Sequence, residues 1–209
     1  MLQKLSIKGR MFMIIGGILL LFAIMSLFAV NNGNKVRDLG LAKTAEVMLE
    51  DQKAKIKVAS HTAALTVGHA LEGISNEQER VSTIRKLIDD IRFETDNSGY
   101  FFVYKGTTCV ALPPKKSLHG KDLASVKDKN GVFLVRELNE MAGKGGGFVE
   151  YIWPKPGADD TPKLGYAEMI PGTDYWIGTG VYLDNIDAFN AALSKELKSV
   201  VTKETVKMG

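Results

Sequence analysis

The fold of this chain is decided by residues 148–182, FVEYIWPKPGADDTPKLGYAEMIPGTDYWIGTGVY. This stretch predicts three β-strands, over 148–153, 163–170 and 175–182, because aromatic and β-branched residues gather there while Pro, Gly and Asp gather between them. Strands that follow one another through short links usually pair antiparallel. We therefore expect one antiparallel sheet.

A hairpin is predicted just upstream of these strands. Tyr100–Tyr104 and Thr107–Leu112 are runs of β formers, and Lys105-Gly106 is a turn between them. Asn97-Ser98-Gly99 forms a turn before the first run, and Pro113-Pro114 ends the second, since proline cannot donate to a strand ladder. The hairpin brings the predicted number of strands to five.

Two helices are predicted before the sheet. Residues 35–72 contain no proline and are rich in Ala, Lys, Glu, Leu and Val, which favours one long helix, broken or bent near Gly68 or Gly73. Ser75-Asn76-Glu77-Gln78 then matches a capping box with Ser75 as the N-cap. The second helix carries an apolar stripe at helical spacing, made of Val81, Ile84, Leu87, Ile88 and Ile91.

Two further helices complete the pattern. A helix over about 131–143 has Phe133, Leu134, Leu138 and Met141 as its apolar positions and stops at the triple glycine 145–147. Asp184 caps a final helix, whose apolar side is Ile186, Phe189, Leu193, Leu197 and Val200. The order of elements predicts an α+β domain, with helices flanking an antiparallel sheet.

A membrane anchor is predicted near the N-terminus. Residues 12–30, FMIIGGILLLFAIMSLFAV, include no charge, and nineteen helical residues extend roughly 28 Å, close to the thickness of a bilayer core. Lys4, Lys8 and Arg10 precede them, so the positive-inside rule leaves residues 1–11 in the cytoplasm and sends the remainder across the inner membrane. A cleaved signal peptide is the alternative, but the apolar run is long for one and no A-x-A pattern follows it.

The charges and the single cysteine exclude several classes of function. The net charge is +3, from 27 Lys and Arg against 24 Asp and Glu, and the three surplus charges lie before the apolar run. The remaining chain balances to zero, which argues against a nucleic-acid surface. One cysteine, Cys109, excludes an internal disulfide and any C-x-x-C pair.

Catalysis is not supported by any motif. His61 and His69 lie eight residues apart on the predicted first helix, too far to share one metal ion as an i, i+4 pair would. None of the metalloprotease, nucleophile-elbow or phosphate-loop motifs occurs. The glycines at 143–147 and 178–180 follow a helix or lie inside a strand, where they make turns or close packing. We therefore expect a protein that is not an enzyme and needs no metal or cofactor.

Aromatic residues alternate along the predicted strands. Tyr100, Phe102 and Tyr104 share one face, as do Tyr151 and Trp153, and Tyr166 and Trp176 lie on the last two strands. Buried phenol and indole groups seek hydrogen-bond partners, so such a face suits a small polar ligand. An ordinary aromatic core is the alternative.

Two cations could hold an acidic ligand at this sheet. Arg92 ends the second predicted helix eight residues before Tyr100, where its guanidinium could grip a carboxylate. Its other interpretation is a salt bridge or a bond to the last carbonyls of the helix. Lys163, directly after Pro162, is a second and weaker candidate.

The segment from Gly99 to Asp187 resembles a known family. Its blocks GYFFVYKGTTCVALPP, LHGKDLASVKDKNGVFLVREL, GKGGGFVEYIWPKPG and WIGTGVYLDNID are similar to the single Cache domain (type 2) of bacterial chemoreceptors and sensor kinases. The resemblance implies a PAS-like antiparallel sheet of five to six strands on a long N-terminal helix, with a pocket on one face that binds small organic acids. It places Arg92 and Tyr100 at family positions associated with the pocket, and Tyr151, Trp153, Lys163 and Tyr166 in blocks that line or border it. Together with Phe102, from the alternating aromatic face, these are the predicted ligand-binding residues.

The chain departs from the family pattern at two places in the sequence. Family members often have an Asp where Lys105 stands and a His-Pro where this chain has Leu112-Pro113, so a ligand donor is lost and the preferred acid is expected to differ. The resemblance also implies a second span and a signalling region after the last helix, whereas this chain ends in a polar KETVKMG.

These patterns lead to two functional expectations. Residues 33–190 form the sensor domain, outside the cytoplasm, of a chemoreceptor or related transducer, and residues 191–209 are a C-terminal tail. The alternative is a stand-alone, membrane-anchored solute-binding protein that passes its ligand or signal to a partner. A homodimer through the long helices is expected in either case.

Overall fold

The structure, a computed structural model, describes residues 6–207. The chain divides into two compact units, one formed by residues 47–189 and the other by residues 1–46 together with 190–209. The first of these units contains the sheet. The predicted apolar position Val200 lies among the side chains outside the described part.

The sheet has five strands in the order β2-β1-β5-β4-β3, all antiparallel. The strands are β1 (Phe102–Lys105), β2 (Thr108–Ala111), β3 (Gly147–Pro154), β4 (Asp160–Met169) and β5 (Tyr175–Tyr182). The antiparallel prediction is confirmed, and β5 has the predicted bounds. The first strand begins two residues later than predicted, while β4 begins three residues earlier.

One continuous helix, α1 (Ile7–Leu71), takes the place of the membrane anchor predicted over 12–30 and the long helix predicted over 35–72. It is the single helix among residues 6–207 that is long and apolar enough to cross a membrane. The predicted break at Gly68 is wrong, because that glycine lets the helix approach Pro171 closely: an added Cβ would lie 3.2 Å from the Pro171 carbonyl oxygen. The helix ends before Gly73, whose φ of +75° suits glycine best.

The second helix, α2 (Glu77–Ile88), is capped by Asn76 and not by Ser75. The Asn76 side-chain oxygen accepts the Glu79 N–H at 3.0 Å, so the cap lies one residue later than predicted. Ile84 and Ile88 are buried as expected. Ile91 is exposed because the helix ends before it, which also leaves Arg92 outside the helix.

The remaining elements follow the predicted order with one addition. Pro113-Pro114 ends the hairpin, but the segment after it forms a short 3-10 helix, η2 (Pro113–Leu118), where a loop was expected. The third α-helix, α3 (Leu134–Gly143), and the last, α4 (Asp184–Lys207), confirm the two predicted helices.

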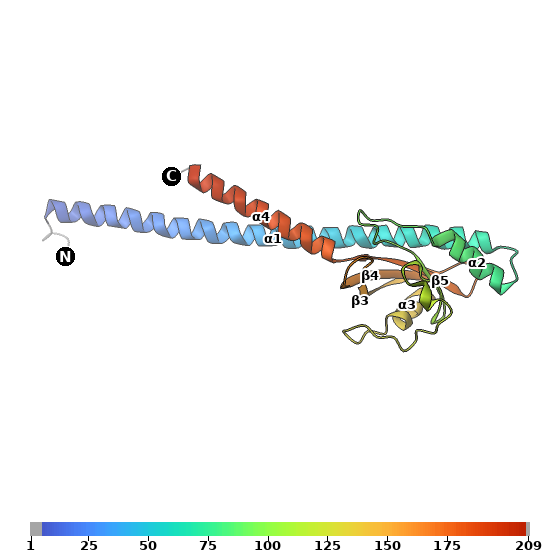
Figure 1. Ribbon diagram of the computed structural model, residues 1–209. Coiled ribbons are helices and arrows are strands. Elements are labelled where there is room, and N and C mark those ends of the chain that lie inside the picture. Colours follow the sequence, from blue (N-terminus) through green and yellow to red (C-terminus); the bar gives the residue numbers. More distant parts are fainter. Residues whose placement is uncertain (1–5, 208–209) are drawn as a thin grey trace. The chain divides into compact units, whose positions relative to one another are not determined.

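The sheet separates two hydrophobic clusters. α3 covers one face, where Tyr100, Phe102, Tyr104, Leu138, Val149, Tyr151 and Trp176 are buried. α2 and the last turns of α1 cover the other face, against Phe101, Val103, Val110, Ile170 and Ile177 (Figure 1). Because side chains alternate along a strand, neighbouring residues of β1 and β5 enter different clusters.

Candidate functional site

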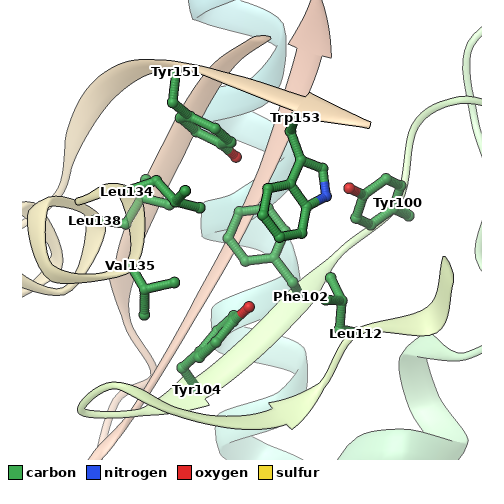
Figure 2. Close-up of a pocket in the computed structure, with 9 residues that line it drawn as sticks. All are labelled: Tyr100, Phe102, Tyr104, Leu112, Leu134, Val135, Leu138, Tyr151 and Trp153. Atoms are coloured by element: carbon green, nitrogen blue, oxygen red, sulfur yellow. The ribbon is translucent and has the colours of Figure 1, made fainter. Parts of the chain in front are cut away.

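A small cavity lies between the sheet and α3, and we call it the inner cavity (Figure 2). Its walls are Tyr100, Phe102, Tyr104, Leu112, Leu134, Val135, Leu138, Tyr151 and Trp153. Figure 2 shows the hydroxyl groups of the three tyrosines directed toward the middle of these residues. Polar groups that converge in an apolar chamber are typical of small-ligand sites.

Aromatic packing fixes the floor of the inner cavity. Tyr104 stacks on Trp176 with ring centroids 4.8 Å apart, and Phe102 meets the same indole edge-on at 6.1 Å. The Trp176 Nε1–H donates to the Gly106 carbonyl at 2.8 Å, so the indole has its hydrogen bond outside the cavity. These contacts hold the rings of β1 in place on the sheet.

Burial changes the acidity of the phenol groups in the cavity. It raises the pKa of Tyr104 and of Tyr151 well above the usual value, because a phenolate would lose its hydration there. Both phenols therefore remain protonated near neutral pH and can donate hydrogen bonds. Protonated donors suit an anionic ligand.

Lys163 is the buried cation of this region. Its side chain is 1% exposed, and its ammonium has no hydrogen-bond partner within the described part of the chain. Nζ lies 3.9 Å from the centre of the Tyr100 ring and 4.7 Å from that of Tyr182. Burial lowers the pKa of Lys163, and the neighbouring Tyr100 partly opposes this. Because burial disfavours the charged form of this amine, an anion that entered beside it would stabilise the ammonium.

Glycines on β4 and β5 make room for these side chains. A Cβ at Gly180 would lie 2.8 Å from the Lys163 Cε and 2.6 Å from the Leu164 carbonyl oxygen. A Cβ at Gly178 would lie 2.6 Å from the Phe102 ring. The bare backbone therefore lets the lysine stem and the Phe102 ring lie directly on the sheet.

The structure brings together five of the seven predicted site residues. Tyr100, Phe102, Tyr151 and Trp153 line the inner cavity. Lys163 is not itself a wall residue, but it lies against the rings of Tyr100 and Phe102, which are.

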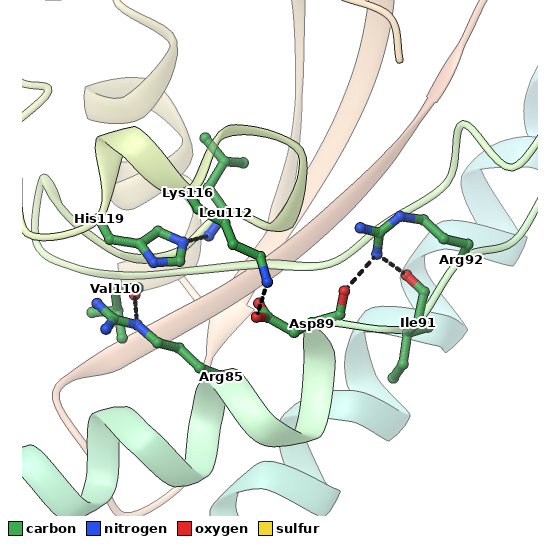
Figure 3. Close-up of polar contacts among 8 residues, drawn as sticks. All are labelled: Arg85, Asp89, Ile91, Arg92, Val110, Leu112, Lys116 and His119. Atoms are coloured by element: carbon green, nitrogen blue, oxygen red, sulfur yellow. Dashed lines mark hydrogen bonds and ion pairs between the residues drawn. The ribbon is translucent and has the colours of Figure 1, made fainter. Parts of the chain in front are cut away.

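Arg92 lies elsewhere, on the surface near the end of α2 (Figure 3). Its Nη1 donates to the carbonyl oxygens of Asp89, at 2.9 Å, and Ile91, at 2.6 Å. This is the alternative role left open by the sequence, a bond to carbonyls after a helix. The structure does not bring Arg92 to the inner cavity.

Tyr166 lies on the opposite face of the sheet from the cavity. It belongs to the cluster with Ile56 of α1, and its hydroxyl donates to Glu168 at 3.2 Å. Glu168 in turn contacts His61 Nδ1 at 2.9 Å. Burial and the Glu168 carboxylate raise the pKa of Tyr166 to about 12. Lys163 and Tyr166 are three residues apart on one strand, so their side chains point to opposite faces.

Sequence reasoning did not assign a ligand role to five wall residues, namely Tyr104, Leu112, Leu134, Val135 and Leu138. The alternation along β1 placed Tyr104 on the right face, and the apolar stripe of 131–143 contained Leu134 and Leu138. What the pattern lacked was the packing of α3 on this face. Among the described residues no cluster of His, Cys, Asp and Glu could hold a metal ion.

The fold and the cavity together define a class of protein: a domain with a PAS-like antiparallel sheet, a long N-terminal helix and a small cavity on one face of the sheet. Residues 46–200 match the family model described as Cache domain. The chain therefore belongs to the Cache domain family, which confirms the resemblance.

Solved structures agree with this assignment. The chain is similar to the crystal structure of a methyl-accepting chemotaxis protein from Vibrio parahaemolyticus, with 31% identity and a TM-score of 0.62 over 70% of this chain and 98% of the other. It is also similar to a Cache chemosensory domain solved for its carboxylic acid recognition, with 27% identity, a TM-score of 0.58, and coverage of 66% and 97%.

Longer relatives show where such domains occur. The chain is 28% identical to the methyl-accepting chemotaxis protein CtpM of Pseudomonas aeruginosa, over 90% of this chain and 34% of the relative. It is 25% identical to the sensor histidine kinase MctS of Rhizobium johnstonii, over 88% and 41%. The chain thus spans about a third to two fifths of these relatives, and it is a sensor domain of the kind found in chemotaxis receptors and histidine kinases.

Proposed function

We propose that this chain senses a small carboxylate outside the cytoplasm and that the inner cavity is the binding site. The observation that carries the proposal is the buried Lys163 ammonium, which has no hydrogen-bond partner among the described residues and lies against the ring of Tyr100. A carboxylate would receive hydrogen bonds from the tyrosine hydroxyls and compensate the buried positive charge. That the similar Cache domain was solved for carboxylic acid recognition supports this choice.

The membrane side follows from the charges around α1. Basic residues precede its apolar part, which favours a cytoplasmic N-terminus and a sensor domain on the far side of the membrane. A phosphatase reporter that is active only outside the cytoplasm, fused after residue 209, should therefore be active. An inactive reporter beside a correctly inserted control would reverse the topology.

The proposed binding is tested with the full chain in detergent. We expect some acid of two to four carbons to raise the melting temperature, because a ligand at 100 times its Kd stabilises the folded state by about 2.7 kcal/mol. Lys163→Met should abolish this gain while the ligand-free protein keeps its stability, since Met keeps the apolar stem and removes the buried charge.

Arg92→Ala is the matched control. Because Arg92 lies outside the inner cavity, this variant should keep the full thermal gain. If Arg92→Ala loses the gain and Lys163→Met keeps it, the acid binds near α2 and the inner cavity is not the site. If no acid stabilises the wild-type chain, the carboxylate proposal is wrong.

A second copy of the chain is the partner that we propose for α1. Val47, Val58 and Leu65 are exposed, at 50%, 66% and 41%, and their spacings of eleven and seven residues place them on one side of the helix. With Cys109 replaced by Ser, Val58→Cys should form an interchain disulfide on mild oxidation. Lys57→Cys, one step around the helix, should not. Equal cross-linking of both variants would argue against a defined helix pair.

A further inference from the structure

A second cavity lies next to the inner cavity, and we call it the outer cavity. It has a volume of about 300 Å³ and is lined by Lys115, Leu118, Leu123, Val126, Lys127, Asp128, Lys129, Ile152, Trp153, Pro154 and Asp160. Only Trp153, among the residues that the structure describes, lines both cavities. The Trp153 side chain is therefore the wall that the two cavities share.

The inner cavity is too small for the ligand that we propose. Its walls leave about 10 Å³, which is about the space of a single water molecule. The smallest carboxylates have three or four non-hydrogen atoms, so at least one wall must move when an acid binds.

Trp153 is the wall with the greatest freedom to move. The other eight wall residues are all buried, at 6% exposure or less, on the sheet, on α3 or at the end of the hairpin. Trp153 is half-buried and stands one residue before the end of β3. Figure 2 shows its indole among the other wall side chains, so its displacement would enlarge the chamber.

Lys115, which lines the outer cavity, makes a cation–π contact with the Trp153 indole. Its Nζ lies 4.6 Å from the centre of the Trp153 ring, and it comes from η2, which follows the wall residue Leu112. A cation over an indole at a partly exposed site favours the contact by about two- to fivefold. The contact is strong enough to favour the closed position and weak enough to open thermally.

We propose that Trp153 is the gate of the inner cavity and the residue that limits the length of the acid. This inference rests on the proposed carboxylate site and adds its access and its specificity. When the indole is in place, only the short chamber is available. When it is absent, the tail of a longer acid can lie against Leu118, Leu123 and Val126 of the outer cavity, which are apolar.

The test is calorimetric titration of the full chain with unbranched monocarboxylates of two to eight carbons. The wild-type chain should bind the short acids best. Trp153→Ala should weaken the shortest acids and move the optimum to longer ones, with a gain of about fourfold in affinity for each methylene that enters the apolar outer cavity. Trp153→Phe, which keeps an aromatic partition, should retain a short optimum.

Lys115→Met tests the closing contact separately. In stopped-flow mixing, this variant should bind and release the preferred acid about two- to fivefold faster, while the preferred chain length stays the same. Unchanged rates would show that Lys115 does not hold the gate.

The outcomes separate this inference from the proposed function. If wild-type and Trp153→Ala chains bind acids with the same length preference, while circular dichroism shows both folded, the gate is overturned and the binding site remains. If the wild-type chain binds no acid in the series, both fall together.

Discussion

The two faces of the sheet are built from alternate residues of the same strands, yet they differ in chemistry. The face under α1 and α2 buries mainly aliphatic residues, such as Val103, Ile170 and Ile177. The face under α3 buries tyrosines and tryptophan and contains the Lys163 amine, which has no hydrogen-bond partner among the described residues. Each face has a buried polar atom without a hydrogen-bond partner among the described residues, the Tyr175 hydroxyl on the first and the Lys163 amine on the second, but the lysine can also carry a positive charge. The difference indicates that stability is concentrated on one face and recognition on the other.

The largest expected effect is a loss of stability on the aliphatic face. Ile177 of β5 is fully buried there, so Ile177→Ala should lower the free energy of unfolding by about 2–5 kcal/mol through lost burial and the cavity left behind. Urea denaturation followed by far-UV circular dichroism measures this change. Met169→Ala, at a partly exposed position of the neighbouring strand, should cost under about 1 kcal/mol. Equal losses for the two variants would contradict the comparison.

A smaller effect is expected on the aromatic face, where stability and binding change together. Gly180→Ala places a Cβ against the Leu164 carbonyl and the Lys163 stem, so overpacking should cost about 1–3 kcal/mol and displace the ammonium. The thermal gain from the acid should then disappear. Both effects are read from melting curves of the full chain with and without the acid.

Gly143→Ala is the control for that change. No atom lies within 4 Å of the added Cβ at this position, which is the last residue of α3. Alanine there should leave binding intact and, as a better helix former, raise stability by up to about 1 kcal/mol. Retained binding in Gly180→Ala would show that the position of the Lys163 stem does not matter for the ligand.

The strands were predictable because their signals are local. Alternating aromatic residues and the Pro-Gly-Asp links are read directly from residues 148–182, and β5 has the predicted bounds. Strand alternation also placed Tyr100, Phe102 and Tyr104 on one face, which the structure confirms. The same rule shows that Tyr166 faces away from Lys163, because the two residues are three apart on β4, so the sequence already contained the signal against placing both at one site.

The rest of the site depends on packing between distant segments. The rotation of α3 about its own axis decides that Val135 and Leu138 close the inner cavity, and no local pattern fixes that rotation. Arg92 seemed close to the sheet along the chain, but α2 ends at Ile88 and the guanidinium binds two nearby carbonyls. Sequence distance was a poor measure of position because the segment between α2 and β1 turns back on itself, with Phe93 and Gly99 bridged.

The smallest expected change in stability concerns two contacts that link the inner cavity to α2, which we call the joint between the two faces. His119 Nε2 accepts the N–H of Leu112, a wall of the inner cavity, at 2.9 Å, and next to it Lys116 pairs with Asp89 at the end of α2 at 2.6 Å (Figure 3). Burial, with the charge of Arg85, lowers the pKa of His119. The joint therefore depends on a neutral imidazole.

The sign of the pH dependence follows from that lowered pKa. Below the ordinary histidine value of about 6.5, the unfolded chain takes up a proton that folded His119 does not, so the free energy of unfolding should fall as the pH falls. His119→Gln can still accept the Leu112 N–H without titrating, and its stability should decrease less between pH 7.5 and 5.5. His61 and His69 are unchanged between the two proteins, so the difference isolates His119. His119→Ala, which removes the acceptor, should cost about 0.5–1.5 kcal/mol at pH 7.5. If the wild-type and His119→Gln chains lose stability in parallel on acidification, the joint does not sense pH, and the two faces are coupled by packing alone.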